Sequence, residues 1–311
     1  MHINEFSIGM GPAIFSRTSK KTAIKNSLRI LPIGGYVAMV GEDEDVKDDS
    51  RALCNKPVWQ RMIITAAGSV MNLLLGVILT FAMTLSSSAI GNTTVAGFTD
   101  GASSQSYGLR VGDEITKIGS HSVRTMNEVA YDIMHDATKP VDITVLRGGE
   151  KTVLKGVVFG EETEDGVAYG IMDFKVAAVS KTVSNITRHT FRNSVLSIRM
   201  IWESLYDFVT GKYSVDAVSG PIGITSTITN VAKEGAVNLI YLTSVLAMNL
   251  GIFNLLPIPA LDGGRLFFQL IELIFRRPIN RKVEGYIHTA GLMILFALII
   301  LITFKDISKL L

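Results

Sequence analysis

The residues best suited to chemistry lie in one short segment, residues 254–266, which reads NLLPIPALDGGRL. Pro257 and Pro259 cannot continue an α-helix, because proline lacks the N–H and its ring clashes with the preceding turn. Asp262 follows this break directly and is itself followed by two glycines, which allow the backbone to approach a neighbour closely. A carboxylate beside an apolar run is costly in a membrane and is a functional candidate by default. Spacing alone leaves two interpretations open: Asp262 caps a cytoplasmic helix that begins just after it, or it is a functional carboxylate.

The composition indicates a membrane protein. Of 311 residues, 48% are hydrophobic and 19% are charged, whereas a soluble domain has about 25% charged residues. The mean hydropathy is +0.35, and the apolar residues are concentrated in runs. The net charge of +2 gives no reason to expect a nucleic-acid partner, and the single cysteine, Cys54, cannot form an internal disulfide.

Three apolar stretches are long enough to cross a bilayer. We expect spans at residues 62–90, 236–266 and 287–304, with the second ending in the segment that carries Asp262 and a cytoplasmic loop at 267–286. A helix broken at membrane depth is tolerated only where the backbone is buried in protein or lines a cavity. The sequence therefore predicts that the segment around Asp262 is enclosed.

Small residues recur on one face of the first span, where Gly68, Asn72 and Gly76 are four residues apart. Glycines at this spacing permit close helix packing, which is their simplest interpretation. A buried amide in lipid must find partners. Asn72 is therefore a weaker candidate for a substrate contact.

Residues 93–174 change to a soluble α/β character. Thr125 and Glu128 form a capping box at the start of a short helix, and an alternating hairpin is predicted around Gly148 and Gly149. The stretch GLRVGDEITKI before them resembles a PDZ domain of the bacterial protease type. That resemblance implies a possible extended peptide ligand, bound by strand addition. Residues 176–234 have the three- and four-residue apolar spacing of amphipathic linker helices, interrupted at VSGPIGI.

Residues 1–61 are expected to form a cytoplasmic loop that contains a membrane-associated β-hairpin at 29–41, RILPIGGYVAMVG, with its turn near Gly34 and Gly35. Lysine and arginine are enriched before the first span and between the second and third. The positive-inside rule places both regions in the cytoplasm and the PDZ-like domain outside the cell. The predicted fold class is thus a polytopic α-helical membrane protein with about three spans, one inserted α/β PDZ-like domain and a β-hairpin.

The order of motifs resembles the site-2 proteases, the intramembrane zinc peptidases of bacterial envelope signalling. The pattern N-x-x-P-x-P-x-L-D-G-G at 254–264 looks like that family's third-ligand motif, and EFSIGMGP at 5–12, LPIGGYVAMVG at 31–41 and AAGSVMNLLLG at 66–76 resemble other family segments. The position of Ser69 departs from the family, where proline is common. The resemblance covers essentially the whole chain.

The resemblance implies a site as well as a fold. Asp262 would bind Zn²⁺ beside two histidines of an HExxH helix, and Asn254 would contact the backbone of a transmembrane protein substrate. Residues Gly34, Gly35, Tyr36 and Val37 would hold that substrate extended. The expected substrates are anti-sigma factors or remnant signal peptides, and the expected location is the plasma membrane.

The sequence departs from the family pattern in one respect that changes the expected zinc site: it contains no HExxH. Its histidines are His2, His121, His135, His189 and His288. Zinc hydrolysis needs about three protein ligands and a water, and the HExxH glutamate acts as the base. We therefore expect Met1 to be an internal methionine of a longer protein, and this chain to be inactive alone. The alternative is a non-catalytic, membrane-anchored PDZ protein that binds a peptide or regulates a protease.

Overall fold

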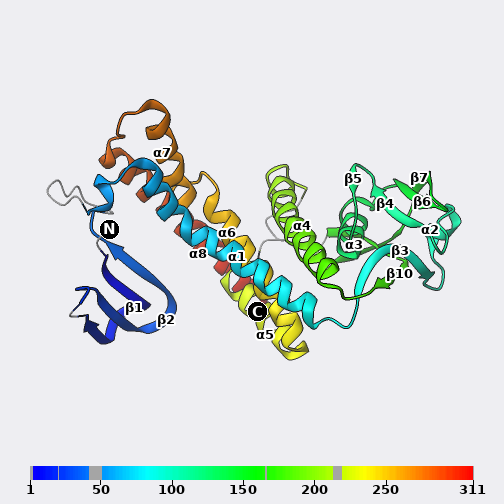
Figure 1. The fold of residues 1–311 in the computed structure, drawn as a ribbon, viewed down its shortest axis with the longest axis horizontal. Coiled ribbons are helices and arrows are strands. Elements are labelled where there is room, and N and C mark those ends of the chain that lie inside the picture. Colours follow the sequence, from blue (N-terminus) through cyan, green and yellow to red (C-terminus); the bar gives the residue numbers. More distant parts are fainter. Residues whose placement is uncertain (1–2, 20, 42–50, 165–166, 213–218, 311) are drawn as a thin grey trace. The chain divides into compact units, whose positions relative to one another are not determined.

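A computed structural model of the chain describes residues 3–19, 21–41, 51–164, 167–212 and 219–310 (Figure 1). The chain divides into two compact units. The first unit comprises residues 1–68 and 255–292, and the second comprises residues 69–254 and 293–311.

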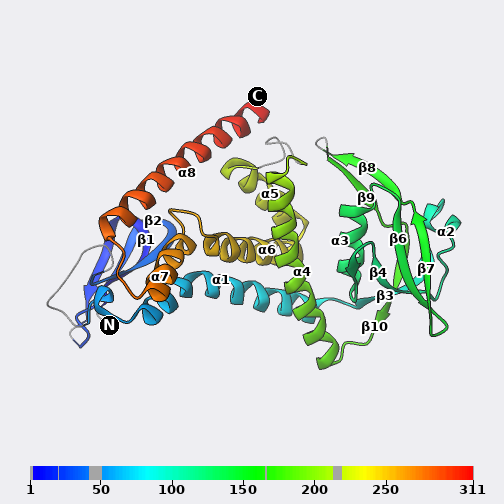
Figure 2. The same ribbon diagram turned by 90° about the horizontal axis from the view of Figure 1, so that it is seen from above.

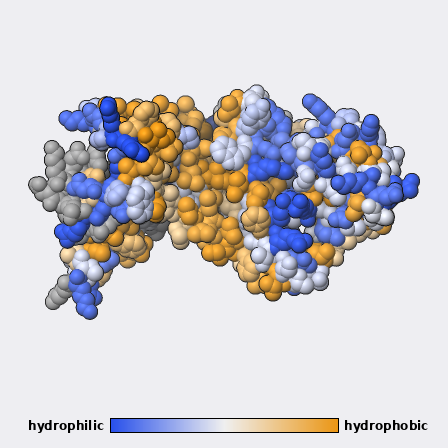
Figure 3. Space-filling view, turned by 45° about the horizontal axis from the view of Figure 1, so that its top comes forward, coloured by the Kyte–Doolittle hydropathy of each residue, from blue (hydrophilic) through white to orange (hydrophobic). Residues whose placement is uncertain are grey.

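Among the described residues, three helices are long and apolar enough to cross a membrane: α1 (Val58–Ser86), α6 (Ala236–Leu255) and the Lys282–Ser308 part of α8 (Arg281–Leu310). In the most apolar 18-residue window of each helix, only 0–22% of the window is buried inside the protein. Figure 3 shows the apolar residues gathered over these helices and the hydrophilic ones over the α/β part. Exposed apolar helices of this length are typical of a membrane protein, as the three apolar runs predicted.

The N-terminal sheet contains β1 (Ile3–Thr18) and β2 (Lys25–Met39), both sharply bent. Phe6 pairs with Val37 on one side and with Asn26 on the other, and Arg17 also pairs with Asn26. The segments are therefore ordered 13–18, 25–29, 5–8 and 35–39 across the sheet. We expected the two arms of the 29–41 segment to pair with each other, but in the recorded register they flank β1 instead.

The side chain of Arg29 connects several segments of this sheet by hydrogen bonds. Its guanidinium donates to the Ser7 hydroxyl at 2.9 Å, to the Glu5 carboxylate at 2.8 Å and to the Tyr36 hydroxyl at 2.6 Å. It also lies over the Tyr36 ring, 5.3 Å from the centroid. A planar group with five N–H donors can join segments in this way.

The second unit contains an α/β module. Its elements are β3 (Ile90–Phe98), α2 (Ser103–Ser106), β4 (Glu114–Ile118), β5 (His121–Ser122), α3 (Met126–Asp136), β6 (Val141–Arg147), β7 (Glu150–Val157), β8 (Gly160–Glu164), β9 (Val167–Ile171) and β10 (Phe174–Val179). The main sheet has the order β10-β3-β4-β6-β7, with β5 on β4, and β8 pairs with β9 (Figure 2). The predicted capping box at Thr125 and Glu128 is present, with both reciprocal hydrogen bonds.

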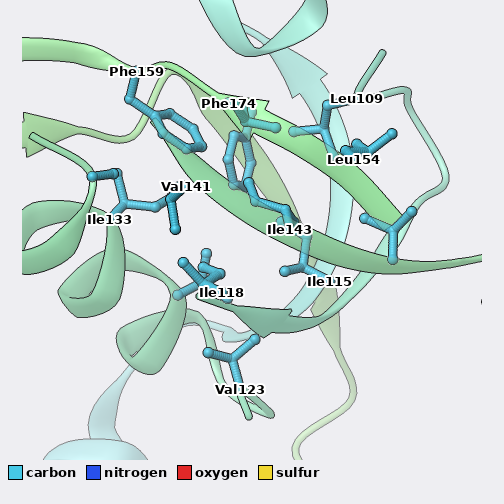
Figure 4. Close-up of a cluster of buried hydrophobic side chains, with 14 of the residues drawn as sticks. Leu109, Ile115, Ile118, Val123, Ile133, Val141, Ile143, Leu154, Phe159 and Phe174 are labelled. Carbon is cyan, nitrogen blue, oxygen red and sulfur yellow. The ribbon is translucent and has the colours of Figure 1, made fainter. Parts of the chain in front are cut away.

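The module has its own hydrophobic core (Figure 4). Ile115, Ile118, Ile143 and Val145 are 0% exposed. Ile143 and Val145 are alternate residues of β6 and share one face of the sheet, whereas Ile115 and Ile118 are separated by an irregularity in the pairing of β4 with β6, which lets both face the core. Phe174 is 2% exposed and closes this core from β10.

Beyond the module, α4 (Val183–Val209) is followed by α5 (Pro221–Glu234), which begins in the VSGPIGI segment. The carboxylate of Asp306 accepts hydrogen bonds from the N–H groups of Gly220 (3.2 Å) and Gly223 (2.9 Å). It thereby satisfies donors that the first helical turn leaves unpaired. A side chain at Gly220 would collide with this carboxylate.

Gly76 fulfils the predicted packing role. A Cβ built there would lie 2.4 Å from Cγ of Met248 on α6. The Gly76 carbonyl accepts hydrogen bonds from Thr80 and Ser244, both at 2.9 Å, and these two hydroxyls lie 2.8 Å apart. A glycine contact with hydroxyl bonds beside it is typical of helix pairs in membranes.

Replacing Ile143 by Ala should destabilise the module by about 2–5 kcal/mol, because it leaves a cavity in a closed core. Hydrogen exchange of the β4 and β6 amides should accelerate accordingly. The matched control is Val153→Ala on β7, where the side chain is 53% exposed, and exchange should stay near that of the parent. Equal protection in both variants would contradict this account of the core.

A cavity at the start of α7

The functional candidate Asp262 lies at the end of a braced loop. Residues 256–261 connect α6 to α7 (Asp262–Phe275), and the prolines in this stretch prevent a continuous helix. The N–H of Ile258 donates to the Leu256 carbonyl at 2.7 Å, and the N–H of Leu261 donates to the Ile258 carbonyl at 3.2 Å. The loop therefore satisfies part of its own backbone within a few residues.

Asp262 is the first residue of α7, and Leu261 is the N-cap. Leu261 makes no side-chain cap hydrogen bond. The interpretation of Asp262 as the cap of a later helix is therefore wrong, although a carboxylate in the first turn still suits the helix dipole.

Gly263 and Gly264 are required by contact with the loop. A Cβ on Gly263 would lie 2.1 Å from the Leu256 carbonyl oxygen, and one on Gly264 would lie 2.5 Å from that of Ile258. The two glycines thus let α7 start directly against the broken backbone, which fixes where the Asp262 carboxylate begins.

Asp262 lines a cavity of about 660 Å³ within the first unit. The lining combines segments far apart in the sequence: residues from β2, the start of α1, α7 and the start of α8. They are Gly35, Val37, Met39, Gly41, Leu53, Cys54, Arg61, Ile64, Thr65, Gly68, Asp262, Arg265, Phe268, Gln269, Glu272, Pro278, Ile279, Glu284, Gly285 and His288.

Gly68 faces the carboxylate, since a Cβ on it would lie 3.8 Å from Oδ2 of Asp262. Beside it, α1 and α7 are joined by polar contacts. Arg61 donates to the Glu272 carboxylate at 2.6 Å, and Gln269 donates to the Thr65 hydroxyl at 3.1 Å. These bonds hold the two helices that form the wall opposite β2.

One face of the β2 strand lines the cavity. Gly35, Val37 and Met39 are alternate residues and all belong to the lining, as expected for side chains on one face of a strand. Tyr36 lies between them and bonds to Arg29 instead. The structure thus brings Gly35 and Val37 together with Asp262, and it gives Tyr36 a place in the sheet. Gly34 is outside the lining and has a positive φ of 68°.

His288 was missed as a site residue because sequence analysis considered histidines only as HExxH partners. It lines the cavity from α8. Its Nδ1 accepts a hydrogen bond of 3.0 Å from the N–H of Ala260, whose φ is +80°. Its buried Nε2 has no hydrogen-bond partner among the described residues. His288 therefore secures the one strained residue of the loop that presents Asp262.

The described residues offer Zn²⁺ only part of a site here. Asp262 supplies a carboxylate oxygen, which is an accepted zinc ligand. Among residues 3–310 as far as they are described, no group of three metal-binding side chains within reach of one ion includes Asp262. Among the described residues, Asp262 therefore fits one ligand position of such a site.

Asn254 and Asn72 belong to the second unit. Asn72 is partly buried on α1, and Asn254 lies near the end of α6. Neither side chain is part of the cavity lining, and their proposed contacts with substrate remain predictions.

In the described part of the chain, three helices are long and apolar enough to cross a membrane, and a carboxylate lines a cavity beside a helix break. The sequence profile of peptidase family M50 matches residues 1–298. The chain belongs to this family, the site-2 proteases.

Curated relatives cover nearly the whole chain. It is 34% identical to a protein of Clostridium perfringens named as a zinc metalloprotease, over 99% of this chain and 90% of that protein. A Fusobacterium nucleatum protein named in the same way is 34% identical over 100% of this chain and 91% of its own length. The chain is 29% identical to the regulator of sigma-W protease RasP of Bacillus subtilis, over 98% of this chain and 91% of that protein.

Replacing Gly263 by Ala should lower the thermal unfolding midpoint of the detergent-solubilised chain, because the new methyl group collides with the Leu256 carbonyl. Overpacking of this kind costs about 1–3 kcal/mol. Gly285→Ala is the matched control, since nothing lies within 4 Å of a Cβ there and alanine favours a helix. A midpoint for Gly263→Ala equal to that of the control would show that α7 does not start in contact with the loop.

Proposed function

We propose that this chain carries the aspartate ligand and the substrate-holding strand of an intramembrane zinc endopeptidase. The observation that supports the proposal most strongly is that Asp262 and one face of the 35–39 segment line the same cavity. The family and the zinc metalloprotease names of its relatives support the reaction class. The proposed reaction is hydrolysis of a peptide bond in a transmembrane protein, as part of regulated intramembrane proteolysis.

A transmembrane substrate must leave the helical state before it can be cleaved, because a helix keeps its carbonyls in intrahelical bonds. The 35–39 segment pairs with β1 on one side in the recorded register. Its other edge offers backbone groups to an added strand, a common way of binding extended peptides. Gly35 and Val37 are the proposed substrate contacts in the cavity, and Asn254 and Asn72 are weaker ones.

Zinc, when bound, would supply an activated water. The contribution of this chain is to hold Asp262 in one ligand position: Gly263 and Gly264 set the start of α7, and His288 secures the loop. The 311 residues do not include the HExxH that would supply two further ligands and a base. We propose that this chain alone is inactive, and that catalysis requires a span with this motif.

The α/β module is proposed to be PDZ-like and extracytoplasmic, in a multi-pass protein of the plasma membrane. The strand order, the capped helix α3 and the charge distribution of the loops support this placement. The relative from Bacillus subtilis is named for regulation of sigma-W. An anti-sigma factor is accordingly a proposed substrate, as is a remnant signal peptide, and the module could bind a peptide at a sheet edge.

In a chain with an HExxH span fused ahead of residue 1, Asp262→Ala should abolish stoichiometric zinc and reduce cleavage of a transmembrane substrate at least about 100-fold. Changes outside the ligand set alone already cost about 10–100-fold. Metal content by mass spectrometry and cleavage in proteoliposomes measure the two effects.

The control for this variant is Glu272→Gln, which removes another carboxylate that lines the cavity but keeps the side-chain shape. Zinc should be retained. Zinc and cleavage that both survive Asp262→Ala would refute the ligand assignment. If the fused parent neither binds zinc nor cleaves, the non-catalytic alternative, a membrane-anchored binding or regulatory protein, is favoured.

Substrate contact with the strand can be tested by disulfide trapping. In a Cys54→Ser background of the 311-residue chain, Val37→Cys should cross-link to a single-span substrate whose cysteine is moved residue by residue through the span. The yield should peak at one or two positions, because an added strand has a defined register.

Tyr36→Cys is the matched control, since Tyr36 is adjacent in sequence but bonds to Arg29. It should give a severalfold lower yield at every substrate position. Equal yields for the two variants, or no preference along the substrate, would exclude strand addition at this segment.

A further inference from the structure

A second group of metal-binding side chains lies in the α/β module. His121 on β5 faces Asp132 and Asp136, which are four residues apart and therefore share one face of α3. Nδ1 of His121 is 3.6 Å from Oδ1 of Asp132 and 3.4 Å from Oδ2 of Asp136. One donor atom from each residue lies within 4.8 Å of the others. Among the described residues, no other three His, Cys, Asp or Glu side chains bring their donor atoms this close together.

These separations suit a small divalent ion. Zinc lies about 2.0–2.1 Å from histidine nitrogen and about 2.0–2.2 Å from carboxylate oxygen, usually with tetrahedral geometry. Two ligand atoms of such a site are therefore about 3.4 Å apart. The two distances from His121 are close to this value, so an ion needs only small side-chain movements.

Two buried polar atoms of this group lack hydrogen-bond partners among the described residues, although Oδ1 of Asp132 accepts a hydrogen bond from Arg199. Asp132 is 1% exposed, and its Oδ2 accepts no hydrogen bond among the described residues. Nδ1 of His121 is likewise buried without a hydrogen bond. Buried polar atoms without partners cost free energy and call for an explanation such as an ion. An ion bound to Nδ1 of His121 would satisfy that atom.

The surroundings carry an excess of negative charge. Glu203 and Asp207 on α4 face the same region as Asp132 and Asp136. The permanent cations that pair with these four carboxylates are Arg199 and Lys212. Burial raises the pKa of Asp132 to about 6, against the opposing effect of Arg199 and His121. The four carboxylates thus outnumber these two permanent cations, although Arg199 directly contacts Oδ1 of Asp132.

We propose that His121, Asp132 and Asp136 form a binding site for a divalent transition-metal ion, Zn²⁺ in the first instance, separate from the position of Asp262. An imidazole nitrogen with two carboxylates favours zinc over magnesium or calcium, which prefer oxygen ligands. Nδ1 of His121 would bind the ion. Glu203 lies 3.8 Å from Nε2 of His121 and is placed to orient the ring, as carboxylates outside the ligand set do in known sites.

The test measures Zn²⁺ binding to the full chain in detergent by calorimetry. All proteins carry Asp262→Ala, so that the family's own ligand contributes nothing. The parent in this background should bind one equivalent. Asp136→Asn and His121→Ala should each weaken binding at least about tenfold, the scale on which even supporting residues act. Asp136 is the safer variant, because its side chain is 29% exposed.

His189→Ala is the matched control, since its ring bonds to Asn193 on α4 and belongs to no such group. It should bind like the parent, and Mg²⁺ at the same concentration should not compete. The thermal midpoint of the parent should rise with Zn²⁺, and that of Asp136→Asn should not.

Absence of binding in the Asp262→Ala background overturns the proposal, as does unchanged affinity in both His121→Ala and Asp136→Asn. The chain that keeps Asp262 is measured beside this background; if it binds zinc and the Asp262→Ala background does not, the result supports the site in the first unit and counts against this one. The two proposals therefore fail separately.

Discussion

The structure depends on one constraint: a backbone that leaves the helix at membrane depth must have its polar groups satisfied by protein. Two prolines force this break between α6 and α7, and nearby hydrogen bonds satisfy polar groups of the broken backbone. Short loop bonds pair Ile258 and Leu261, and the His288 ring accepts the N–H of Ala260. Broken backbone is costly unless its polar groups are paired, and the loop that these bonds brace leads directly to Asp262 in the cavity lining.

Parts of the fold could be predicted from the sequence because they depend on local residue patterns. Spans are set by long apolar runs, and the module by alternation and by turn residues such as those of the β6–β7 hairpin. These patterns are local, and the structure has helices over the first and third expected spans. The second span was expected to reach residue 266, but α6 ends at Leu255, and a separate helix, α7, occupies Asp262–Phe275, part of which was expected to be a loop.

The two arms of the 29–41 segment were expected to pair with each other, because nothing local indicates that both pair with β1 instead, at Leu31 with Met10 and at Val37 with Phe6. Strand order is a long-range property, and a single sequence does not carry it.

For the site, local chemistry was again predictable and long-range contacts were not. Asp262 and its glycines stand out because rare residue types follow a helix break. His288 does not stand out, since its role depends on a bond to a residue 28 positions earlier. The bond from Arg29 to Tyr36 likewise could not be predicted from the sequence, and the substrate contact expected for Tyr36 stays a prediction. Resemblance identifies segments, and only contacts distinguish the residues that face a cavity from those that support it.

The contact between the module and α4 differs from the contact between α1 and α6. Elsewhere in the second unit, Gly76 and Met248 pack closely with hydroxyl bonds beside them. Between α3 and α4, the bonds are charged: Arg192 with Glu128 at 2.7 Å, His135 with Asp207 at 2.8 Å, and Arg199 with Asp132. Partly buried pairs of this kind contribute little net stability, because desolvation offsets their attraction. They do make the contact depend on charge, so an ion bound at His121 would alter the Asp132 carboxylate on which Arg199 relies. A module held in this way responds to its ionic surroundings, whereas one held by an apolar surface would not.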